Sequence, residues 1–555
     1  MDTRLLIAVA LSFVAVLAYQ ELVLKRLYPP KEQQAQTAAE NQVSPSAAAV
    51  PTNAPSTLPS APITSMPAAG TATARAIEVE TDTFIAKFTT QGGRLLSLRL
   101  KKFRETARPD SPLMELVTPA PGGQLPLGLV IETNHGRLDD RTLNYNSNGP
   151  DRIVLHDLQH AHLTFTTASA GLKMSKAIDL EGSGYVFNLD AEVSGPPGEV
   201  KAVGLNMSEP LTAHQGYYDI PEIQALVNNK AAVKAEKALR KGVEPLKGNI
   251  TYVGFGDRYF LTVFLPKSPQ EGTVAMDFNG SEATAAMLFA PHAADGAVRL
   301  ATRVYMGPKN LTTLEEVNPL LNRAIDFGWS GILALAFLRA LKLFHYIAPN
   351  WGVDIILLTV AIRVAFLPMS IKSQRSMMRL QRLQPQVERL REKFKDDRDR
   401  LNREMVDLYK RNHVNPLGGC LPMLLQLPIF IGLYEALLNA VELRHAPFVG
   451  WIRDLSAPEC LPIPHVPKLA FLPCGGIPVL VLLMGVSTYF QQQMTPQSPD
   501  PSQQRMMMLM PLVFTIMFLN FPSGLTLYYF CSNVLGMAQQ YVLNREFKQL
   551  SPANA

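Results

Sequence analysis

Residues 353–371 read VDIILLTVAIRVAFLPMSI, an apolar run that is interrupted by two charged side chains, Asp354 and Arg363. The hydrocarbon core of a bilayer is about 30 Å thick and is crossed by about 20 helical residues, so this run predicts a membrane-spanning helix. Trp351, just before the run, is of the type that anchors the end of a span at headgroup depth. Further apolar stretches predict six spans in all, the others being Leu5–Leu24 and residues 417–441, 475–491, 506–521 and 524–541.

The segment after this run predicts the orientation of the whole chain. Residues 372–413 contain thirteen Lys or Arg against seven Asp or Glu. A short loop with such an excess of positive charge faces the cytoplasm. The preceding span therefore runs inward, residues 25–352 lie outside, and both termini are cytoplasmic.

The composition excludes several other classes of protein. Of the 555 residues, 47% are hydrophobic and only four are cysteine, which excludes both a disulfide scaffold and disorder of the whole chain. The net charge of +5 is too small to indicate direct, specific binding to nucleic acid.

Changes of composition divide the chain into predicted segments. A retained N-terminal anchor is favoured over a cleavable signal peptide, because residues 15–19 (AVLAY) lack the usual cleavage pattern of small residues. Residues 28–74, which follow the anchor, consist mostly of Ala, Pro, Ser, Thr and Gln and cannot bury enough apolar surface to fold. The predicted boundaries are 1–27 for the anchor, 28–74 for a flexible linker, 75–317 for a β-sandwich, 318–352 for a connector, 353–371 for the second span, 372–415 for a helical hairpin, 416–545 for the last four spans and 546–555 for a short tail.

The predicted β-sandwich is an antiparallel domain with turns rich in Gly, Pro and Asn. Residues 185–193 alternate between apolar and polar side chains, which is the period of a half-buried strand. Residues 221–242 are rich in Ala, Lys and Glu and predict a surface helix. We find no cysteine, metal-ligand cluster, nucleophile motif or phosphate loop in this region, so a scaffold or docking role is favoured over catalysis, and no cofactor or metal is expected.

Two amphipathic segments flank the second span. Residues 332–348 combine a Leu and Phe face with regularly spaced basic side chains, which predicts a helix lying in the membrane interface. The basic loop repeats apolar residues at intervals of three and four, which predicts a helical hairpin turning near residues 396–397.

Arg363 lies near the centre of its span. A central Arg costs roughly 2.5 to 3.5 kcal/mol on insertion scales, so such residues normally face a hydrated cavity or a buried partner. One interpretation is a structural ion pair with a neighbouring helix, and Glu435 is the candidate partner at a depth offset of roughly 6 Å. The other is a polar cavity lined by Arg363 and Glu435 together with Thr359, Gln426 and Ser532.

Two further features bear on the membrane region. The spans 475–491 and 506–521 correspond to only about 26 and 24 Å of helix, so the adjacent bilayer should thin. Cys460 and Cys474 fall in the outer loop between the third and fourth spans and could form a disulfide in an oxidising compartment.

Three segments resemble those of a known family. They are NPLGGCLPMLLQLPIFIGLYEAL at 415–437, VELRHAPFVGWIRDLS at 441–456 and FPSGLTLYYFCSN at 521–533. They are similar to the signature segments of the YidC family of bacterial membrane protein insertases, over roughly residues 318–545. YVGFGDRYF and VYMGPK in the outer domain look like the Gram-negative form.

The resemblance implies a periplasmic β-supersandwich and a core of five helices around a hydrophilic groove open to the cytoplasm and to lipid. Its groove arginine falls on Arg363, and its polar lining includes Thr359 and Gln426. The apolar slide between the third and fifth spans, with the aromatic pair of the last span, implies Leu427, Phe430, Phe514, Phe518, Tyr528 and Tyr529.

The implied function is insertion and folding of inner-membrane proteins, alone or with the Sec translocon, with no enzyme activity. Newly made membrane proteins and the lipid bilayer are the expected partners. The tail after Arg545 is short, so we expect only weak ribosome binding. Arg379, Arg382, Arg389 and Lys393 are the predicted cytoplasmic docking residues. The alternatives are a transporter or channel that uses the Arg363 cavity, a saccharide-modifying membrane enzyme, and an assembly factor for a larger translocon.

Overall fold

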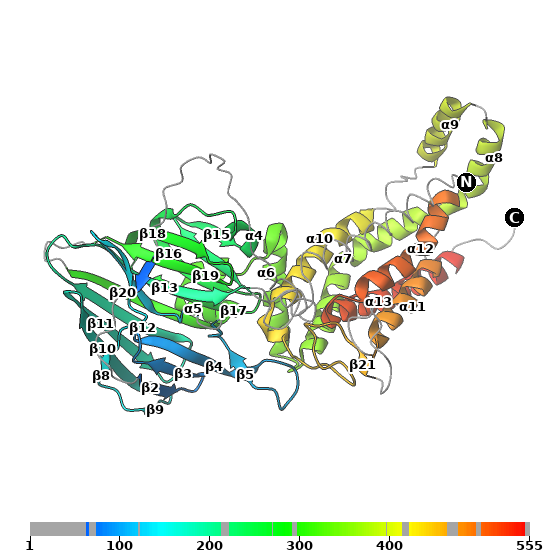
Figure 1. Cartoon of the computed structure of the whole chain (residues 1–555). Coiled ribbons are helices and arrows are strands. Elements are labelled where there is room, and N and C mark those ends of the chain that lie inside the picture. The colour runs from blue at the N-terminus through cyan, green and yellow to red at the C-terminus, as the bar shows by residue number, and fades with distance from the viewer. Residues whose placement is uncertain are drawn as a thin grey trace, which may run out of the picture. The chain divides into compact units, whose positions relative to one another are not determined.

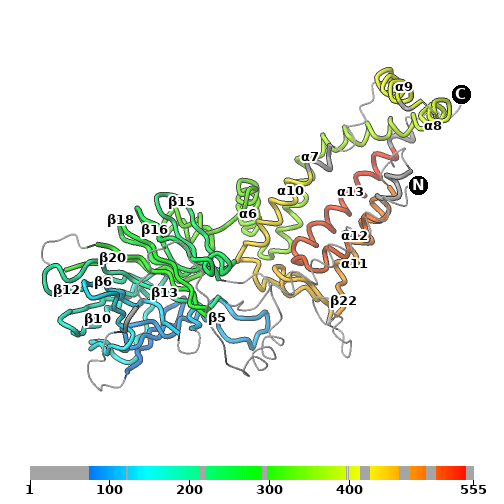
Figure 2. Tube along the Cα trace, turned by 45° about the horizontal axis from the view of Figure 1, so that its top comes forward, coloured from blue at the N-terminus to red at the C-terminus, as the bar shows by residue number. Residues whose placement is uncertain are grey.

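The computed structural model describes residues 63–65, 74–119, 123–211, 221–268, 270–290, 297–395, 397–412, 421–462, 476–494 and 501–549. The predicted anchor 1–27 and Cys474 lie outside these residues, as do most of the linker 28–74 and most of the tail 546–555. Figures 1 and 2 show a β domain followed along the chain by a set of helices.

Two sheets form the described β domain. The larger has the order β1-β7-β6-β13-β19-β18-β16-β17-β20-β12-β11-β10-β8, and the hairpin β14-β15 joins it by pairing with β16. Its strands are β1 Ile63–Ser65, β6 Gly128–Thr133, β7 Gly136–Asp139, β8 Asn146–Ser147, β10 His160–Ser169, β11 Leu172–Glu181, β12 Val186–Ser194, β13 Val200–Pro210, β14 Glu222–Val227, β15 Lys230–Lys234, β16 Leu246–Gly256, β17 Phe260–Pro266, β18 Gln270–Phe278, β19 Glu282–Phe289 and β20 Ala297–Pro308. The smaller has the order β5-β4-β3-β2-β9, formed by β5 Leu113–Glu115, β4 Arg94–Arg104, β3 Phe84–Thr89, β2 Ala76–Glu80 and β9 Arg152–Val154.

The predicted alternation at residues 185–193 is confirmed by β12. Phe187, Leu189 and Val193 are buried on one face of this strand, which pairs antiparallel with β11 and β20. Phe187 also meets Phe88 of the smaller sheet edge to face, with ring centroids 6.3 Å apart. Side chains of both sheets thus fill one apolar core, which is the β-sandwich that the sequence predicts.

The predicted helix at 221–242 is wrong for most of its length. The structure forms the hairpin β14-β15 there, followed by a short helix, α4 Glu236–Leu239. Asn228 and Asn229 at the turn have φ of 50° and 60°, and such a pair suits the tight turns of β-hairpins. Pairing of β14 with β16 supplies long-range hydrogen bonds that outweigh the local helix propensity.

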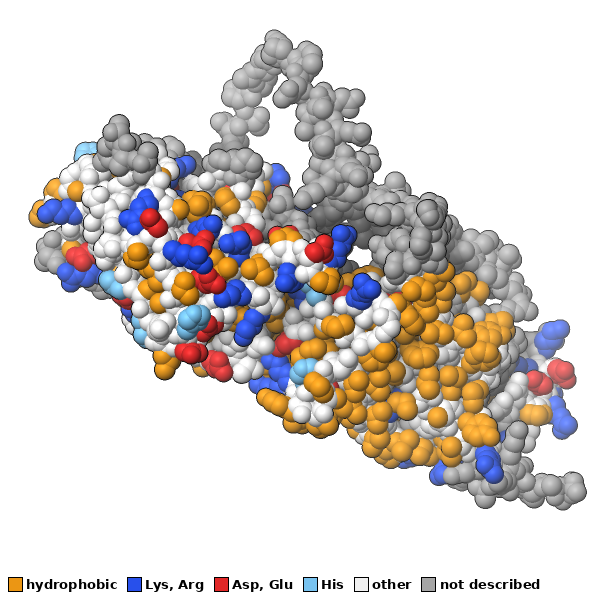
Figure 3. Space-filling view, turned by 90° about the horizontal axis from the view of Figure 1, so that it is seen from below, with side chains coloured by type: hydrophobic (Ala, Val, Ile, Leu, Met, Phe, Trp, Pro, Cys, Tyr) orange, Lys and Arg blue, Asp and Glu red, His pale blue; other side chains and the backbone are white. Residues whose placement is uncertain are grey.

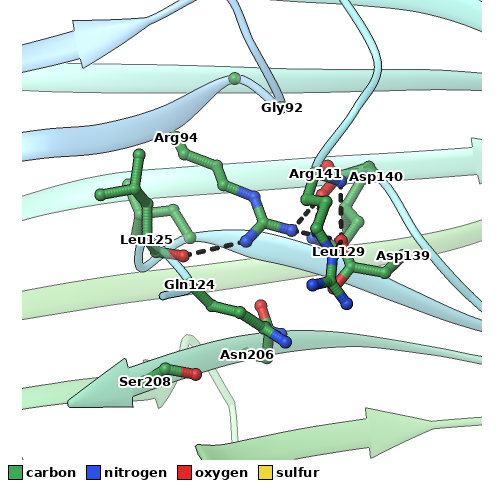
Figure 4. Close-up of polar contacts among 12 residues, drawn as sticks. Gly92, Arg94, Gln124, Leu125, Leu129, Asp139, Asp140, Arg141, Asn206 and Ser208 are labelled. Carbon is green, nitrogen blue, oxygen red and sulfur yellow. Dashed lines mark hydrogen bonds and ion pairs between the residues drawn. The ribbon is translucent and has the colours of Figure 1, made fainter. Parts of the chain in front are cut away.

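A group of charged side chains lies fully inside the β domain (Figure 4). Arg94 of β4 forms ion pairs of 2.6 and 2.8 Å with Asp139 and Asp140. The Lys176 ammonium of β11 pairs with Asp140 at 2.7 Å, and Tyr145 donates to the same carboxylate at 2.9 Å. Burial by itself raises the pKa of Asp140, but the charges of Lys176 and Arg94 outweigh burial and lower it. We refer to Arg94, Asp139, Asp140 and Lys176 as the buried charge cluster.

The helical part follows β20 along the chain. Its helices are α5 Leu311–Val317, η2 Pro319–Ala324, η3 Gly328–Ser330, α6 Gly331–His345, α7 Trp351–Arg382, α8 Gln384–Lys393, α9 Arg398–Arg411, α10 Leu421–Asn439, η5 Val441–Leu443, α11 Val479–Met494, α12 Pro501–Phe518 and α13 Ser523–Gln549. Between α10 and α11 the short strands β21 Leu461–Pro462 and β22 Gly476–Ile477 pair. Figures 1 and 2 both show α7, α10, α11, α12 and α13 side by side, and α8 with α9 beyond the end of α7.

Within the described residues, one helix is both long and apolar enough to cross a membrane, namely α7, and Met508–Phe518 is a shorter apolar one. The count of six spans therefore stays a prediction, and so do the predicted segment boundaries. Figure 3 shows hydrophobic side chains covering most of the helical part on one face, whereas charged side chains are scattered over the β domain. An apolar surface of this extent is typical of contact with lipid.

Helix α7 continues through the predicted end of its span at residue 371 and ends at Arg382. The helices α8 and α9 then occupy the predicted hairpin, and the Asp397 side chain accepts a hydrogen bond from the Arg400 amide at the start of α9. Asn350 caps the other end of α7 by accepting from the amides of Gly352 and Val353.

Candidate functional site

Arg363 of α7 is held by one residue of α13. Its Nε donates to Ser532 Oγ at 3.1 Å, and its Nη2 donates to Ser532 Oγ and to the Ser532 carbonyl at 2.7 and 2.6 Å. Ser532 is buried, and the Arg363 side chain is half-buried. The guanidinium is therefore anchored between two helices by neutral acceptors, and its charge is not neutralised by them.

The structure does not bring Arg363 and Glu435 together. Among the described residues Arg363 forms no ion pair, and the Glu435 carboxylate instead accepts from the Asn439 side chain at 3.2 Å. Asn439 also donates to the backbone carbonyl of Asp326, in the connector. Glu435 thus belongs to the contact between α10 and the connector.

Two other predicted lining residues have different surroundings. Gln426 of α10 donates to the Tyr528 hydroxyl at 2.8 Å and so links α10 to α13. Thr359 lies one turn before Arg363 on α7, but it is fully buried and its hydroxyl donates to the Ile355 carbonyl at 2.6 Å. Thr359 is therefore satisfied within its own helix.

Further polar contacts, which the sequence analysis missed, continue along α13. Asn533 donates to Ser487 and Thr488 of α11 at 3.0 and 2.8 Å. Two turns further on, Gln539 donates to Ser370 of α7 at 2.9 Å. With Arg363, Ser532, Gln426 and Tyr528, these residues form what we call the polar band of the bundle. The signal in the sequence was the recurrence of Ser, Asn and Gln side chains along otherwise apolar spans.

Gly536 of α13 lies directly beside this band. A Cβ atom there would lie 2.6 Å from Gln491 Nε2 and 3.3 Å from Arg363 Nη2. Glycine therefore leaves room for the ends of the Arg363 and Gln491 side chains beside the α13 backbone, and a larger residue would displace them.

The predicted apolar slide is mostly an aromatic cluster. Phe430 of α10, Phe514 and Phe518 of α12, and Tyr529 of α13 have ring centroids 5.1 to 6.3 Å apart. Phe518 is fully buried, whereas Leu427 is 57% exposed on α10. Tyr528 is buried and lies next to Tyr529, so it connects the aromatic cluster to Gln426 of the polar band.

Two family models match the chain. One is described as "60Kd inner membrane protein" and matches residues 343–550; the other is the YidC periplasmic domain, at residues 76–339. The membrane protein insertase YidC of Syntrophobacter fumaroxidans is 37% identical over 470 residues, which cover 82% of this chain and 83% of that protein. The chain belongs to the YidC family of membrane protein insertases. The YidC of Geotalea daltonii is 35% identical over 556 residues, which cover 98% of this chain and 99% of that protein.

Membership of the YidC family confirms the expected combination of a β-sandwich periplasmic domain with a helical C-terminal region. YidC relatives are insertases and not enzymes, as the sequence predicted. The family consists of inner-membrane proteins. A crystal structure described as an active YidC insertase with its first transmembrane domain resolved covers 84% of this chain and 92% of that chain, at 18% identity and a TM-score of 0.36.

The predicted docking residues of this YidC-family chain are exposed. Arg379 and Arg382 lie on the last turns of α7, and Arg389 and Lys393 lie on α8. The Lys393 ammonium is 5.3 Å from the centre of the Phe394 ring, at the turn between α8 and α9.

Cys460 of the loop before α11 is disulfide-bonded. Cys474, its predicted partner, lies outside the described residues.

Proposed function

We propose that this chain inserts newly made membrane proteins into the bacterial inner membrane, with Arg363 as the polar contact for the segment that must cross. The observation that carries the proposal is the charge of Arg363, which forms no ion pair among the described residues and is held by Ser532 within the polar band of the bundle. An unpaired charge among membrane-spanning helices normally faces water or a substrate. A translocating acidic tail would supply the missing negative charge.

The driving force would come from the substrate. Burying its apolar span in lipid contributes about 0.8 kcal/mol per methylene, which over a whole span exceeds the cost of moving a short polar flank. The polar band would solvate that flank during passage, and the protein itself needs no covalent chemistry or energy source.

The aromatic cluster and Leu427 would form the surface along which the substrate helix leaves for lipid. Leu427 is exposed on α10, three residues before Phe430, and the rings of Phe430 and Phe514 both contact the Tyr529 ring. Planar rings offer large apolar contact without a strict side-chain match, which suits clients of different sequence.

We further propose that the exposed cations of α7 and α8 contact cytoplasmic partners. Arg379, Arg382, Arg389 and Lys393 would meet the ribosome or the Sec translocon. The proposed topology places both termini in the cytoplasm and the β domain in the periplasm.

The deciding experiment is protease protection of a small, short-tailed membrane protein. The client is added to liposomes with and without the purified full-length chain, in the absence of any translocon or energy source. We expect protection only when the chain is present. Equal protection in empty liposomes, with the chain shown to be folded, would contradict autonomous insertion and favour an assembly factor or a transporter.

The hydrated surface can be tested separately with single cysteines in a background without Cys420 and Cys531. Ser532→Cys and Gln426→Cys in intact membranes should react with a water-soluble thiol reagent. Leu482→Cys, on the exposed apolar face of α11, and the buried Thr359→Cys should react much more slowly. Equal rates at all four positions would contradict a water-filled groove.

A further inference from the structure

Three side chains join the end of α6 to the start of α7. His345 Nδ1 lies 2.7 Å from Asp354 Oδ2, and the His345 ring stacks on the Trp351 indole with centroids 3.9 Å apart and planes 8° apart. The connection is short, because only residues 346–350 separate the two helices. Asp354 is further fixed by its backbone amide, which donates to the Asn350 carbonyl at 3.0 Å.

The Asp354 carboxylate is in an unusual position. It is fully buried, and its other oxygen, Oδ1, has no hydrogen-bond partner among the described residues. A buried carboxylate without a counter-charge is costly, since neither water nor a cation compensates its charge. Among the described residues, the positive charge placed to neutralise the Asp354 carboxylate is that of a protonated His345 imidazole.

His345 can exchange that proton with solvent, because 34% of its side chain is exposed. Other charged groups of the surrounding elements are engaged elsewhere. Lys342 of α6 pairs with Glu442 of η5 at 3.0 Å, and Arg339 of α6 pairs with Glu315 of α5 at 3.8 Å.

The other charged groups on the segments that pack against α6 and α7 also have partners other than Asp354. His445 lies 3.8 Å from Asp454 in the loop after η5, and Arg444 of that loop donates to backbone carbonyls. Glu435 of α10 accepts from Asn439. On α13, which packs against α7, the titratable groups of the outer half are Tyr528, Tyr529 and Cys531. Among the residues that the structure describes, His345 is thus the basic side chain that contacts Asp354.

We propose that His345 and Asp354 form a proton-binding site on the outer side of the membrane, which holds the C-terminal end of α6 on α7 while the proton is bound. Loss of the proton leaves a buried, unneutralised carboxylate, and separation of the two helices then relieves it by admitting water. The residues after α6 are suited to such movement, since Tyr346 and Ile347 are highly exposed.

Movement of α6 would be felt by the bundle. A Cβ atom on Gly432 of α10 would lie 2.7 Å from Leu333 Cβ of α6, so these helices are in close backbone contact there. Gly432 lies two residues after Phe430 of the aromatic cluster. The proton site therefore offers a route from the outer pH to the surface proposed for substrate exit.

Trp351 supplies the readout, because a stacked imidazolium quenches indole fluorescence. The full-length chain has three tryptophans, so Trp329→Phe and Trp451→Phe leave Trp351 as the single emitter. In lipid nanodiscs we expect its emission to fall in one transition as the pH is lowered. His345→Gln should abolish the transition.

The opening is tested by iodide quenching of Trp351, which should rise several-fold above the midpoint in the parent protein and remain independent of pH in Asp354→Asn. Asp454→Asn removes the carboxylate next to His445, a different histidine, and should leave both readouts unchanged. If Trp451→Phe does not fold, since Trp451 donates to Glu459, the difference between proteins with and without Trp351 gives the same titration. A transition that persists in His345→Gln, or iodide quenching that does not change with pH in the parent protein, would overturn the proposal.

Discussion

Two arginines, Arg94 in the β domain and Arg363 in the helical bundle, are both held in place by hydrogen bonds. Among the described residues, Arg94 also forms ion pairs with carboxylates, whereas Arg363 does not. Arg94 is buried against Asp139 and Asp140, and Lys176 completes a cluster of two cations and two carboxylates. Among the described residues, the hydrogen-bond acceptors of Arg363 are the hydroxyl and the carbonyl of Ser532. The first charge is neutralised within the fold, and the second remains open to a further partner.

This difference separates a structural role from a functional one. A buried ion cluster with matched charges is locked, because removal of any member leaves an uncompensated charge in a medium of low dielectric constant. An arginine held by neutral acceptors keeps its attraction for anions, and low-dielectric walls strengthen that attraction. The same side chain thus stabilises the fold in one region and is poised for a substrate in the other.

The largest effect is expected from removing one carboxylate of the buried charge cluster. Asp140→Asn leaves the fully buried Lys176 without its carboxylate and should destabilise the β domain by about 3 to 5 kcal/mol. Chemical unfolding of the full-length protein in detergent, followed by limited proteolysis, measures this loss. Asp151→Asn, at an exposed ion pair with Arg75, is the control and should change stability by less than about 0.5 kcal/mol. A small effect at Asp140 would mean that the cluster is not a structural lock.

The same cluster predicts a dependence on acid. Because the pKa of Asp140 in the folded state lies below its ordinary value of 3.8, its ion pairs contribute stability above that value. This contribution is lost as the pH falls through the lowered pKa. Unfolding midpoints between pH 6 and pH 2 should therefore fall more in the parent protein than in Asp140→Asn.

Removing the charge of Arg363 should reduce insertion activity and leave folding intact. Arg363→Ala should reduce insertion of clients with acidic translocated tails by about tenfold, which corresponds to about 1.4 kcal/mol, and of neutral-tailed clients much less. Ser532→Ala removes two of the hydrogen bonds of Arg363 but not its charge, so it should keep the preference for acidic tails. Equal loss for both kinds of client in Arg363→Ala would contradict the electrostatic role.

A smaller effect is expected from adding side-chain volume next to Arg363. Gly536→Val places side-chain atoms against Gln491 and Arg363 and should shift the guanidinium at a cost of about 1 to 3 kcal/mol in stability. Thermal unfolding and the insertion assay measure the two consequences. Ala538→Val, on the exposed face of the same helix, is the matched control. Unchanged insertion in Gly536→Val would show that the position of Arg363 is not critical.

The smallest effect is expected at Glu435, which the structure places with Asn439 and away from Arg363. Glu435→Gln keeps the shape of the side chain and should leave the ratio of acidic-tailed to neutral-tailed insertion unchanged within about twofold. A marked rise in that ratio would mean that Glu435 normally competes for Arg363, as the sequence analysis had allowed.

Several features could be read from local sequence, and their limits are physical. The alternation in β12 and the central position of Arg363 both follow from the period and length of one segment. The hairpin at β14 and β15 could not be read in this way, because its pairing with β16 is a long-range interaction that overrides local propensity. Glu435 was a candidate partner by its depth alone, and the structure places it with Asn439, because depth along a span does not say which way a side chain faces.

The sequence by itself determined the class of the protein, the existence of a β domain, the apolar stretches that are predicted to span the membrane and the presence of a costly arginine in one of them. These properties depend on composition and on periods of a few residues, which act locally. Only the tertiary structure decided which charges meet. Arg363 and Ser532 are 169 residues apart in the chain, and Arg94 and Asp139 are 45 apart. Such pairs form because packing of whole helices and sheets brings distant side chains together, and no local pattern specifies that contact.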